Sequence, residues 1–420
     1  MAELEKYVWQ LVSQAREAAA SLAVASTAAK DAVLLNAAEA LVRRTPAIIA
    51  ANRKDLDAAR RDDRIKPAML DRLRLTRERI AEMAGGLRQV AALRDPVGEL
   101  IAGWTRPNGL RIEKIRVPLG IILMIYEARP NVTADAAALC LKSGNAVILR
   151  GGKEALRSNL AIHAALAGAI SEAGLDPHSV QMVNTPDRAA LDLLLRAEGK
   201  IDVVIPRGGE GLIRAVAEKS RIPVLKHYKG VCHTYVDASA DLAMAEKVCL
   251  NAKLQRPSVC NAMETMLVHA AVAKEFLPRI AAKLKKAGCE MRGDARSRAI
   301  VKAMKPATEE DWATEYNDLI LSIRVVDSLD EAVRHIARYG TQHSDAILTR
   351  DLASAREFAA RVDSAAVFIN TSTRFNDGAQ FGMGAEIGIS TDKLHARGPM
   401  ALPELTSYKY VVYGDGQVRE

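Results

Sequence analysis

The stretch Gln255-Arg256-Pro257-Ser258-Val259-Cys260-Asn261 decides how the chain is read. Before it, small and apolar residues recur every three to four positions over residues 241–254, which predicts an amphipathic helix. Pro257 cannot continue that helix, and it biases Arg256 toward extended backbone. The run Glu264-Thr265-Met266-Leu267-Val268 then predicts a strand. The sequence therefore places Cys260 on a turn between a helix and a strand.

A thiol on such a turn has two interpretations. Substrate can reach it and the flanking elements hold it rigidly, as a covalent nucleophile requires. Alternatively, Cys260 is a small buried hydrophobe, because free cysteine is often inert core. The local pattern leaves both open.

Composition limits the classes of function. A chain of 420 residues suggests two or three domains of ~150 residues each. The net charge of +8 comes from 59 basic and 51 acidic residues that are scattered along the chain. No basic stripe is interleaved with aromatic residues, so nucleic-acid binding is not expected. The modest positive charge suits small anionic ligands such as phosphorylated metabolites.

The cysteines indicate the compartment. Five cysteines without regular spacing, with no Cys-x-x-Cys pair and no His/Cys ladder, predict neither a disulfide framework nor a metal site. A reducing cytoplasm follows as the expected location. The N-terminus has no basic leader before an apolar region, so we expect no signal peptide. The longest apolar run, Val117 to Tyr126, is too short to span a bilayer.

Periodicity predicts an α/β architecture. Residues 3–95 are rich in Ala, Leu and Arg and predict four or so helices that serve as scaffold. Ile121 to Tyr126 is continuously apolar, as in a strand covered on both faces. Strands then alternate with helices, which predicts parallel sheets with helices on both faces, in two domains that meet near Lys229-Gly230. The further predicted strands are 146–150, 180–184, 201–205, 320–326, 346–348, 366–370 and one starting at Pro223; the helices are 134–142, 159–172, 187–198, 210–220 and 271–287.

Two segments alternate apolar and polar residues, Leu110 to Val117 and Tyr408 to Tyr413. This pattern predicts edge strands outside the main sheets. Because exposed strand edges are usually covered or paired with another subunit, we expect an oligomer.

Two groups of residues at predicted strand ends could bind a nucleotide. Arg207-Gly208-Gly209-Glu210-Gly211 follows a strand and opens a helix, where backbone amides bind anions. The alternative is an ordinary glycine turn. Arg150 and Lys153 end another parallel strand, where two cations would suit an adenosine ribose that carries a 2′-phosphate. A solvated turn is the alternative for this pair.

Two residues after the buried strand are candidates for substrate chemistry. Asn131 could donate to a developing oxyanion together with the backbone N–H of Cys260. Arg129 could hold a phosphate or carboxylate through two hydrogen bonds. The alternative is a helix N-terminal region, where Asn is common.

Polar residues also gather near the end of the chain. Thr341-Gln342-His343-Ser344-Asp345 and the segment Asn370 to Gly378 lie beside predicted strands, and the glycine-rich stretch Phe381 to Gly388 follows. His343 would form a Cys–His pair if the fold brought it to Cys260, although lone histidines are more often structural. Arg374 and Asn376 are candidates to hold the substrate.

These segments together resemble one family. Four stretches look like the characteristic segments of the γ-glutamyl phosphate reductase family within the aldehyde dehydrogenase superfamily, and they stand in the right order along the chain. They are Tyr126 to Thr133, Asn251 to Ala262, Thr341 to Asp345 and Phe381 to Gly388. The resemblance covers essentially the whole chain. It implies an aldehyde dehydrogenase-like α/β fold with two Rossmann-like α/β domains and a small β oligomerisation flap. The implied domains are NADP-binding (1–104 and 126–230), catalytic (231–403) and flap (105–125 and 404–420).

The resemblance also implies residue roles. Cys260 is the nucleophile, and Asn131 corresponds approximately to the oxyanion asparagine. Glu315 looks like the ribose-binding glutamate, Arg150 corresponds to the lysine that contacts the adenosine ribose, and the turn from Arg207 to Gly211 resembles the glycine turn by the nicotinamide nucleotide. Lys153 joins the cofactor candidates; the substrate candidates are Arg129, His343, Arg374 and Asn376.

One departure from the wider superfamily is informative. Hydrolytic members carry a glutamate that activates water, and the matching region Leu225 to Gly230 has no carboxylate. The implied reaction is therefore NADPH-dependent reduction of L-glutamyl 5-phosphate to L-glutamate 5-semialdehyde and phosphate through a cysteine thioester, the second step of proline biosynthesis from glutamate. The implied assembly is a cytoplasmic homo-oligomer, a dimer or tetramer.

Several alternatives stay open at this point. The chain could instead be a hydrolytic or CoA-acylating member of the superfamily, or a binding protein that has lost catalysis. The preference for NADPH over NADH, and channelling from a glutamate 5-kinase, are left open by the sequence.

Overall fold

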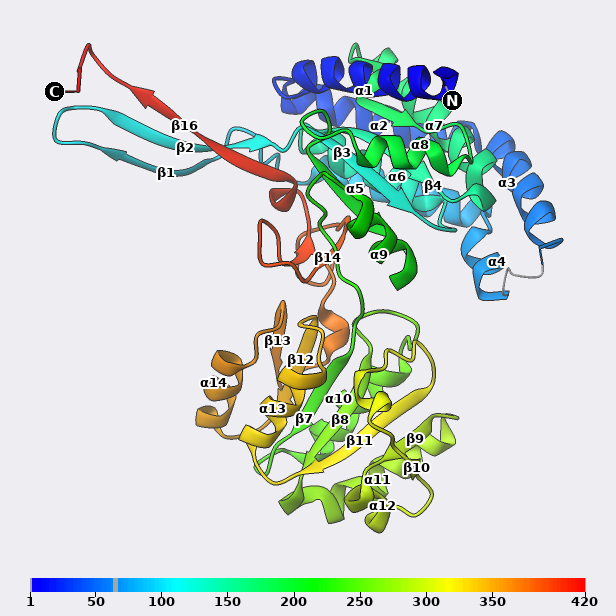
Figure 1. The fold of residues 1–420 in the computed structure, drawn as a ribbon, viewed down its shortest axis with the longest axis vertical. Coiled ribbons are helices and arrows are strands. Elements are labelled where there is room, and N and C mark those ends of the chain that lie inside the picture. The colour runs from blue at the N-terminus through cyan, green and yellow to red at the C-terminus, as the bar shows by residue number, and fades with distance from the viewer. Residues whose placement is uncertain (1, 63–66, 420) are drawn as a thin grey trace. The chain divides into compact units, whose positions relative to one another are not determined.

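The chain forms two compact units, which are described separately (Figure 1). The structure is a computed structural model that describes residues 2–62 and 67–419. Unit 1 comprises Met1–Lys226, Gly382–Gly388 and Met400–Glu420, and unit 2 comprises His227–Phe381 and Ile389–Pro399.

Unit 1 is built on a parallel four-stranded sheet in the order β5-β4-β3-β6. Its central strand β3 (Ile121–Tyr126) is buried along its whole length, as its continuous apolar run predicts. The other strands are β4 (Ala146–Gly151), β5 (Val180–Met182) and β6 (Val203–Arg207). The helices between and after these strands are α6 (Asn131–Lys142), α7 (Leu156–Glu172), α8 (Arg188–Leu195) and α9 (Glu210–Lys219).

The N-terminal part of unit 1 is helical, as predicted. Apolar residues of α1, including Val8, Leu11 and Ala15, share a core cluster with strand residues such as Ile121 and Ile148. This packing joins the helical scaffold to the sheet. The helices are α1 (Ala2–Leu22), α2 (Thr27–Arg43), α3 (Thr45–Ala59), α4 (Pro67–Leu73) and α5 (Arg77–Ala92).

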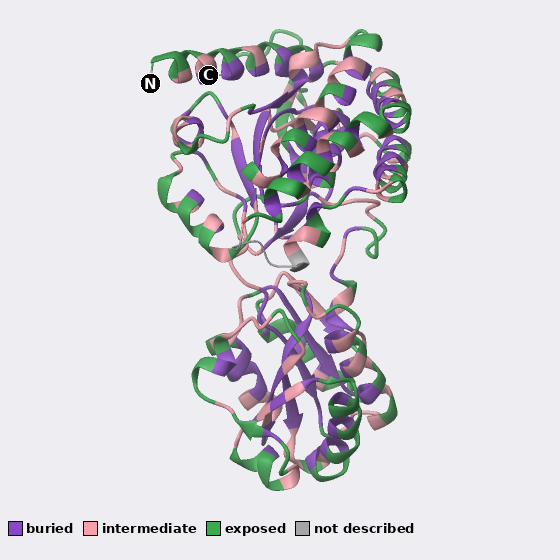
Figure 2. Cartoon of the chain, turned by 90° about the vertical axis from the view of Figure 1, so that its right-hand side faces the viewer, coloured by how far each residue is buried: buried purple, intermediate pink, exposed green. Residues whose placement is uncertain are grey.

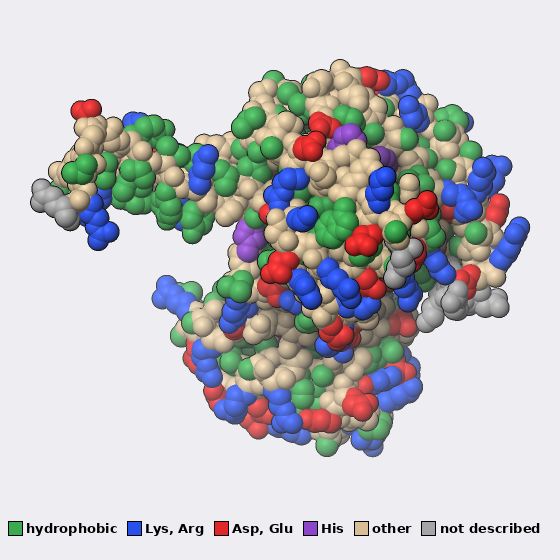
Figure 3. Space-filling model, turned by 45° about the horizontal axis from the view of Figure 1, so that its top comes forward, with side chains coloured by type: hydrophobic (Ala, Val, Ile, Leu, Met, Phe, Trp, Pro, Cys, Tyr) green, Lys and Arg blue, Asp and Glu red, His purple; other side chains and the backbone are tan. Residues whose placement is uncertain are grey.

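An antiparallel arm of three strands extends from unit 1, in the order β1-β2-β16. The strands are β1 (Leu100–Thr105), β2 (Arg111–Pro118) and β16 (Thr406–Tyr413). The prediction that residues 110–117 form an edge strand was wrong, because β1 and β16 pair with the two sides of β2. The alternation of apolar and polar residues indicated a strand with one face toward solvent, but alternation carries no information about whether the edges of a strand are paired. Hydrophobic side chains gather along this arm (Figure 3).

Unit 2 contains a parallel seven-stranded sheet in the order β10-β9-β11-β8-β7-β12-β13. Buried residues run along its strands in Figure 2. The strands are β7 (Cys232–Val236), β8 (Met263–His269), β9 (Glu290–Gly293), β10 (Lys305–Pro306), β11 (Ile320–Val326), β12 (Ser344–Leu348) and β13 (Ala366–Ile369). The helices are α10 (Leu242–Leu254), α11 (Ala270–Lys286), α12 (Ala295–Ile300), α13 (Leu329–Tyr339) and α14 (Leu352–Arg361). Two further short strands, β14 (Gly388–Ser390) and β15 (Gly398–Met400), pair with each other as a separate sheet.

The element before Cys260 is confirmed. α10 spans Leu242–Leu254, and the Asp241 carboxylate caps it by accepting from the backbone amides of Ala243 and Met244. Other boundaries differ from the prediction. α6 begins at Asn131, three residues before its predicted start at Ala134. The strand predicted from Pro223 is only an isolated bridge between Val204 and Val224.

Among residues 2–62 and 67–419, none of the helices combines the length and the apolar character needed to cross a bilayer.

A buried ion pair connects α10 to β8. Lys253 Nζ lies 2.5 Å from Glu264 Oε2, and both side chains are fully buried. Burial raises the pKa of Glu264 to about 7, although Lys253 opposes that shift. The second Glu264 oxygen accepts the backbone N–H of Asn317 at 3.1 Å. The pair therefore fixes the helix that precedes Cys260 to the strand that follows it.

Replacing Lys253 with Met leaves the Glu264 carboxyl group buried without its cation. We expect the free energy of unfolding to fall by about 3–5 kcal/mol, which lowers Tm by roughly 6–20 °C. A raised folded-state pKa gives stability at low pH that is lost as the pH rises through that pKa. Without Lys253 the folded-state pKa of Glu264 rises further, so the variant continues to lose stability above about pH 7, where the wild type no longer does, and its deficit should grow as the pH rises above that value.

The matched control is the double variant K253M/E264L, in which no charge is left buried, so most of the lost stability should return. Thermal unfolding followed by circular dichroism measures both effects. A single variant with the wild-type Tm at about pH 8 would contradict the role given to this pair.

Candidate active site

The turn that carries Cys260 is held by hydrogen bonds to a later segment of unit 2. Asn261 donates its side-chain amide to the backbone carbonyl of Asn376 at 2.9 Å, and Thr373 Oγ1 donates to the carbonyl of Asn261 at 2.7 Å. Arg374 Nε donates to Gln255 Oε1 at 2.9 Å, and another guanidinium nitrogen of Arg374 donates to Asn261 Oδ1. Both sides of the turn are thus fixed.

Gly230 lies directly against the same turn. A Cβ atom at position 230 would come within 1.8 Å of the Cys260 carbonyl oxygen, so only glycine fits. The backbone N–H of Gly230 donates to Glu315 Oε1 at 3.0 Å. Glu315 therefore holds the segment that enters β7 and packs on Cys260. Its ribose-binding role stays a prediction.

The candidate site lies at the amino ends of three neighbouring strands. Cys232 begins β7 and is in register with Met263, which begins β8. Ser344 begins β12 on the other side of β7. His343 directly precedes β12 and Cys260 lies on the turn just before β8, so this arrangement brings the two residues together.

Cys260 is the partly exposed thiol among the five cysteines, and the other four are buried. Burial raises the pKa of Cys140, Cys249 and Cys232, and it raises the pKa of Cys289 to about 11. These four thiols stay protonated and inert at neutral pH. Accessibility therefore separates Cys260 from them.

Two histidines face Cys260. The ligand atoms of Cys260, His227 and His343 all lie within 4.8 Å of one another. The two imidazole rings have centroids 5.3 Å apart in an edge-to-face arrangement. The sequence analysis named His343 but did not name His227 as a site residue. The only sequence signal for His227 was its position in the segment where hydrolytic relatives carry a glutamate.

Hydrogen bonds orient both rings. His227 Nδ1 lies 2.8 Å from the carbonyl oxygen of Ile389. His343 is fully buried, and its Nδ1 lies 2.8 Å from Ser344 Oγ. Asn376 donates its side-chain amide to the same Ser344 hydroxyl at 2.7 Å. The structure therefore brings His343 and Asn376, two predicted substrate residues, to one serine beside Cys260.

Arg374 supplies positive charge near the thiol. Burial and then the charge of Arg256 lower its pKa, while Cys260 and Asp377 act in the opposite direction. Arginine stays protonated at neutral pH in any protein site. The guanidinium can therefore attract an anionic substrate group toward Cys260.

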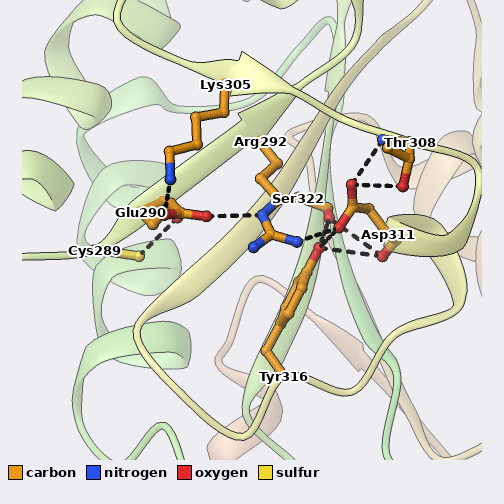
Figure 4. A network of polar contacts seen from close by, with 8 residues as sticks. All are labelled: Cys289, Glu290, Arg292, Lys305, Thr308, Asp311, Tyr316 and Ser322. Carbon is orange, nitrogen blue, oxygen red and sulfur yellow. Dashed lines mark hydrogen bonds and ion pairs between the residues drawn. The ribbon is translucent and has the colours of Figure 1, made fainter.

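A polar network fixes the segment that carries Glu315 (Figure 4). Arg292 binds Glu290 Oε1 at 2.8 Å and Asp311 Oδ1 at 2.6 Å, and Tyr316 donates to the same Asp311 oxygen at 2.8 Å. Burial alone would raise the pKa of Asp311, but the Thr308 amide, Arg292 and Tyr316 lower it to about 2. Tyr316 is thereby anchored next to Glu315.

The other predicted residues lie in unit 1, at the carboxyl ends of its strands. Tyr126 is in register with Gly151 on one side and with Arg207 on the other. This alignment collects the segments that follow β3, β4 and β6 at one edge of the sheet. The predicted residues there are Arg129, Asn131, Arg150, Lys153, Arg207, Gly208, Gly209 and Glu210.

The glycine turn at the start of α9 already binds a carboxylate. The backbone N–H of Gly209 donates to Glu127 Oε2 at 2.9 Å. Arg207 packs against Gly388, and the Glu210 carboxylate pairs with Arg214 at 2.7 Å on the same helix. One amide of this turn is thus occupied by the chain's own carboxylate, and the role of the turn toward a cofactor phosphate stays a prediction.

Arg150 is held by backbone carbonyls at the end of β4. Its guanidinium donates to the carbonyl of Gly151 at 2.9 Å and to that of Pro186 at 3.2 Å. Burial lowers the pKa of Arg150 most, the charge of Glu154 opposes that shift, and the charge of Arg188 adds to it. Arg188 was missed by the sequence analysis because it opens α8, far along the chain from Arg150. Lys153 is exposed on the turn after β4.

Asn131 is the exposed first residue of α6. Its side-chain amide donates to Asp135 Oδ2 at 2.9 Å. Burial raises the pKa of Asp135 to about 6, with Asn131 and Arg207 opposing the shift. One amide hydrogen of Asn131 is thus committed within unit 1, and its oxyanion role stays a prediction. Arg129, also exposed, follows Ala128, whose φ of 33° is unusual for a residue other than glycine.

Comparison with known proteins agrees with this geometry. The aldehyde dehydrogenase family model matches residues 3–318. The γ-glutamyl phosphate reductase of Moorella thermoacetica is 58% identical over 97% of both chains, and that of Geobacter metallireducens is 55% identical over 98% of both. The crystal structure of γ-glutamyl phosphate reductase from Thermotoga maritima superimposes with a TM-score of 0.96 at 48% identity, covering 98% of this chain and 100% of that one. The chain therefore belongs to the aldehyde dehydrogenase family and, within it, to the γ-glutamyl phosphate reductases.

Proposed function

We propose that the chain catalyses the NADPH-dependent reduction of L-glutamyl 5-phosphate to L-glutamate 5-semialdehyde and phosphate, the second step of proline biosynthesis from glutamate. The observation that carries this proposal is a partly exposed Cys260 beside Arg374 and two histidines, with no carboxylate in the 225–230 segment. Full-length similarity to the Moorella reductase, at 58% identity, supports the choice of substrate.

Cys260 acts as the acyl carrier in this proposal. Its thiolate attacks the acyl carbon, the carbon–sulfur bond forms, and the carbon–oxygen bond to phosphate breaks. NADPH, when bound, supplies the hydride that reduces the thioester. The carbon–sulfur bond then breaks, which releases the aldehyde and regenerates the thiolate. The backbone N–H of Cys260 is a candidate donor to the oxyanion at both stages, and the same role for Asn131 rests on the resemblance alone.

The residues around the thiol disfavour hydrolysis. A thioester is hydrolysed quickly only when a base activates water, and His227 stands in the segment where hydrolytic relatives carry that glutamate. Because His227 Nδ1 contacts the Ile389 carbonyl, its ring is held in one orientation. Arg374 favours phosphate as the attacking or leaving group at Cys260.

Unit 1 has features that fit a dinucleotide phosphate. The Gly209 amide at the start of α9 donates to the Glu127 carboxylate, which supports a site for an oxygen anion at this turn. The charge of Arg188 acts on Arg150, and a pair of cations in one region suits a 2′-phosphate. We therefore propose NADP(H) as the cofactor, with Lys153, Arg207, Gly208, Gly209, Glu210 and Glu315 as further contacts.

The arm of unit 1 supports assembly into a homo-oligomer. Trp104, Tyr408, Tyr410 and Val412 are each more than two-fifths exposed on it, and Trp104 packs edge-on against Tyr410 with centroids 6.2 Å apart. Exposed aromatic surface of this kind marks protein–protein contacts. A dimer or tetramer in the cytoplasm is the proposed form, where five free thiols would stay reduced.

Replacement of Cys260 tests the nucleophile directly. Replacing it with Ser should lower kcat on the order of 10³-fold or more, because a hydroxyl is a far weaker nucleophile at neutral pH. NADP⁺ reduction by the semialdehyde in the presence of phosphate measures the loss. C289S is the matched control, because Cys289 is a buried thiol at the far strand β9 and its serine hydroxyl keeps a partner in the Glu290 carbonyl. Full activity in C260S would disprove the mechanism.

Phosphate dependence tests the fate of the thioester on Cys260. When the semialdehyde and NADP⁺ are mixed without phosphate, we expect about one NADPH per active site and then a stop, because the thioester has no water-activating base. Adding phosphate should restart turnover, whereas adding CoA should not. Stopped-flow absorbance resolves the burst. Continued turnover without phosphate would identify a hydrolytic enzyme, and turnover with CoA would identify an acylating one.

Substitutions at Arg150 and Arg188 test the choice of cofactor. Replacing Arg150 or Arg188 with Gln should raise KM for NADPH by about 10–100-fold, the worth of a charge-assisted hydrogen bond. KM for NADH should change by less than about twofold, because NADH lacks the 2′-phosphate. K219Q removes the same charge from the outer end of α9, where Lys219 pairs with Asp192, and serves as the control. Equal losses with both cofactors would contradict the assignment.

A further inference from the structure

We propose that Cys260, His227 and His343 together bind one thiophilic divalent cation of the Zn²⁺ class, which inhibits the enzyme by occupying its nucleophile. The inhibitory consequence rests on the proposed function, whereas the binding site itself does not. The sequence predicted no metal site, because its search covered only closely spaced ligands. The three ligands come instead from three separate segments that the fold of unit 2 brings together.

The distances fit a metal ion. The three ligand atoms lie within 4.8 Å of one another. Bond lengths of about 2.3 Å to sulfur and about 2.0–2.1 Å to nitrogen place the ligand atoms of a tetrahedral zinc about 3.3–3.6 Å apart. Small rotations of the His227 and Cys260 side chains, which are both partly exposed, shorten the separations between ligand atoms to these values. His343, which is fully buried, forms the floor of the site.

The hydrogen bond of His227 fixes the tautomer that ligation requires. A carbonyl oxygen only accepts, so the 2.8 Å contact with Ile389 places the proton on Nδ1 and leaves the lone pair on Nε2. Metal-bound histidines typically donate their other ring N–H to a carbonyl or carboxylate in this way. Ser344 Oγ, 2.8 Å from His343 Nδ1, orients the second ring.

The donor set selects the class of ion. One thiolate and two imidazoles suit Zn²⁺ and related ions, whereas Mg²⁺ and Ca²⁺ prefer oxygen ligands. Three protein ligands leave one coordination position for water or an anion. Because the Cys260 thiol must lose its proton to bind, affinity should rise with pH.

Occupation of this site prevents catalysis. A thiolate whose lone pair is held by the cation cannot attack an acyl carbon. The cation and the acyl phosphate therefore compete for Cys260. Inhibition should be reversible, because a chelator removes the cation without changing any covalent bond.

Cobalt titration tests the site without substrate. Full-length protein treated with EDTA and then desalted should bind one Co²⁺ per chain, with a thiolate-to-metal charge-transfer absorption that Zn²⁺ abolishes by competition. C260S should remove the absorption. H227A should weaken Co²⁺ binding by at least about tenfold. If H227A folds poorly, H227N, a smaller change of side chain, takes its place in the titration. Affinity should tighten as the pH rises, because metal binding displaces the thiol proton.

Cys232 provides the matched control. Its thiol lies 3.8 Å from His343 Nδ1 and donates to the Cys260 carbonyl, yet it is not one of the three clustered ligands. C232S should therefore keep the absorption. Absence of the absorption in wild type, its survival in C260S, or its equal loss in C232S would overturn the site.

The reductase assay separates this inference from the proposed function. Zn²⁺ should inhibit wild type, and EDTA should restore the rate. Full reductase activity at Zn²⁺ concentrations that displace Co²⁺ would overturn inhibition by occupation of Cys260. A protein that binds Co²⁺ through Cys260 but has no reductase activity would overturn the proposed function and support the site.

Discussion

The close approach of Gly230 to the carbonyl of Cys260 holds the candidate site against the start of β7. A side chain at position 230 would meet the Cys260 oxygen at 1.8 Å, so the segment entering β7 lies directly against the turn. Glu315 holds the Gly230 amide, and the Asp311 network holds Tyr316 beside Glu315. The turn itself is tied to Thr373 and Asn376. Segments from distant parts of unit 2 therefore all fix the position of one thiol.

Local chemistry explains why much of the fold was predictable from sequence. β3 is a continuous apolar run because both faces of a parallel strand are covered, and α10 ends before Pro257 because proline cannot continue a helix. The error at β2 has an equally local cause. Alternation describes the two faces of a strand and says nothing about its edges, which are paired through β1 and β16.

The candidate site was less predictable, because the two units place their candidate residues at opposite ends of their strands. In unit 1 they follow the carboxyl ends of β3, β4 and β6, as the general rule for open α/β sheets expects. In unit 2, Cys260 and His343 precede the amino ends of β8 and β12. No local motif marks His227 or Arg188, because each acts beside a residue distant in sequence. Only tertiary structure reveals such pairs.

Burial distinguishes the roles that the five thiols can take. Four are enclosed, and the resulting rise in pKa keeps them protonated and unreactive. Cys260 alone combines partial exposure with neighbouring imidazoles and a guanidinium. Those neighbours provide hydrogen-bonding groups and positive charge, but no carboxylate to activate water. An acyl group on this sulfur is therefore better placed to exchange with an anion than to hydrolyse. The same two imidazoles that adjoin the thiol also complete a donor set for a soft cation, so the features that suit Cys260 to acyl transfer expose it to metal ions.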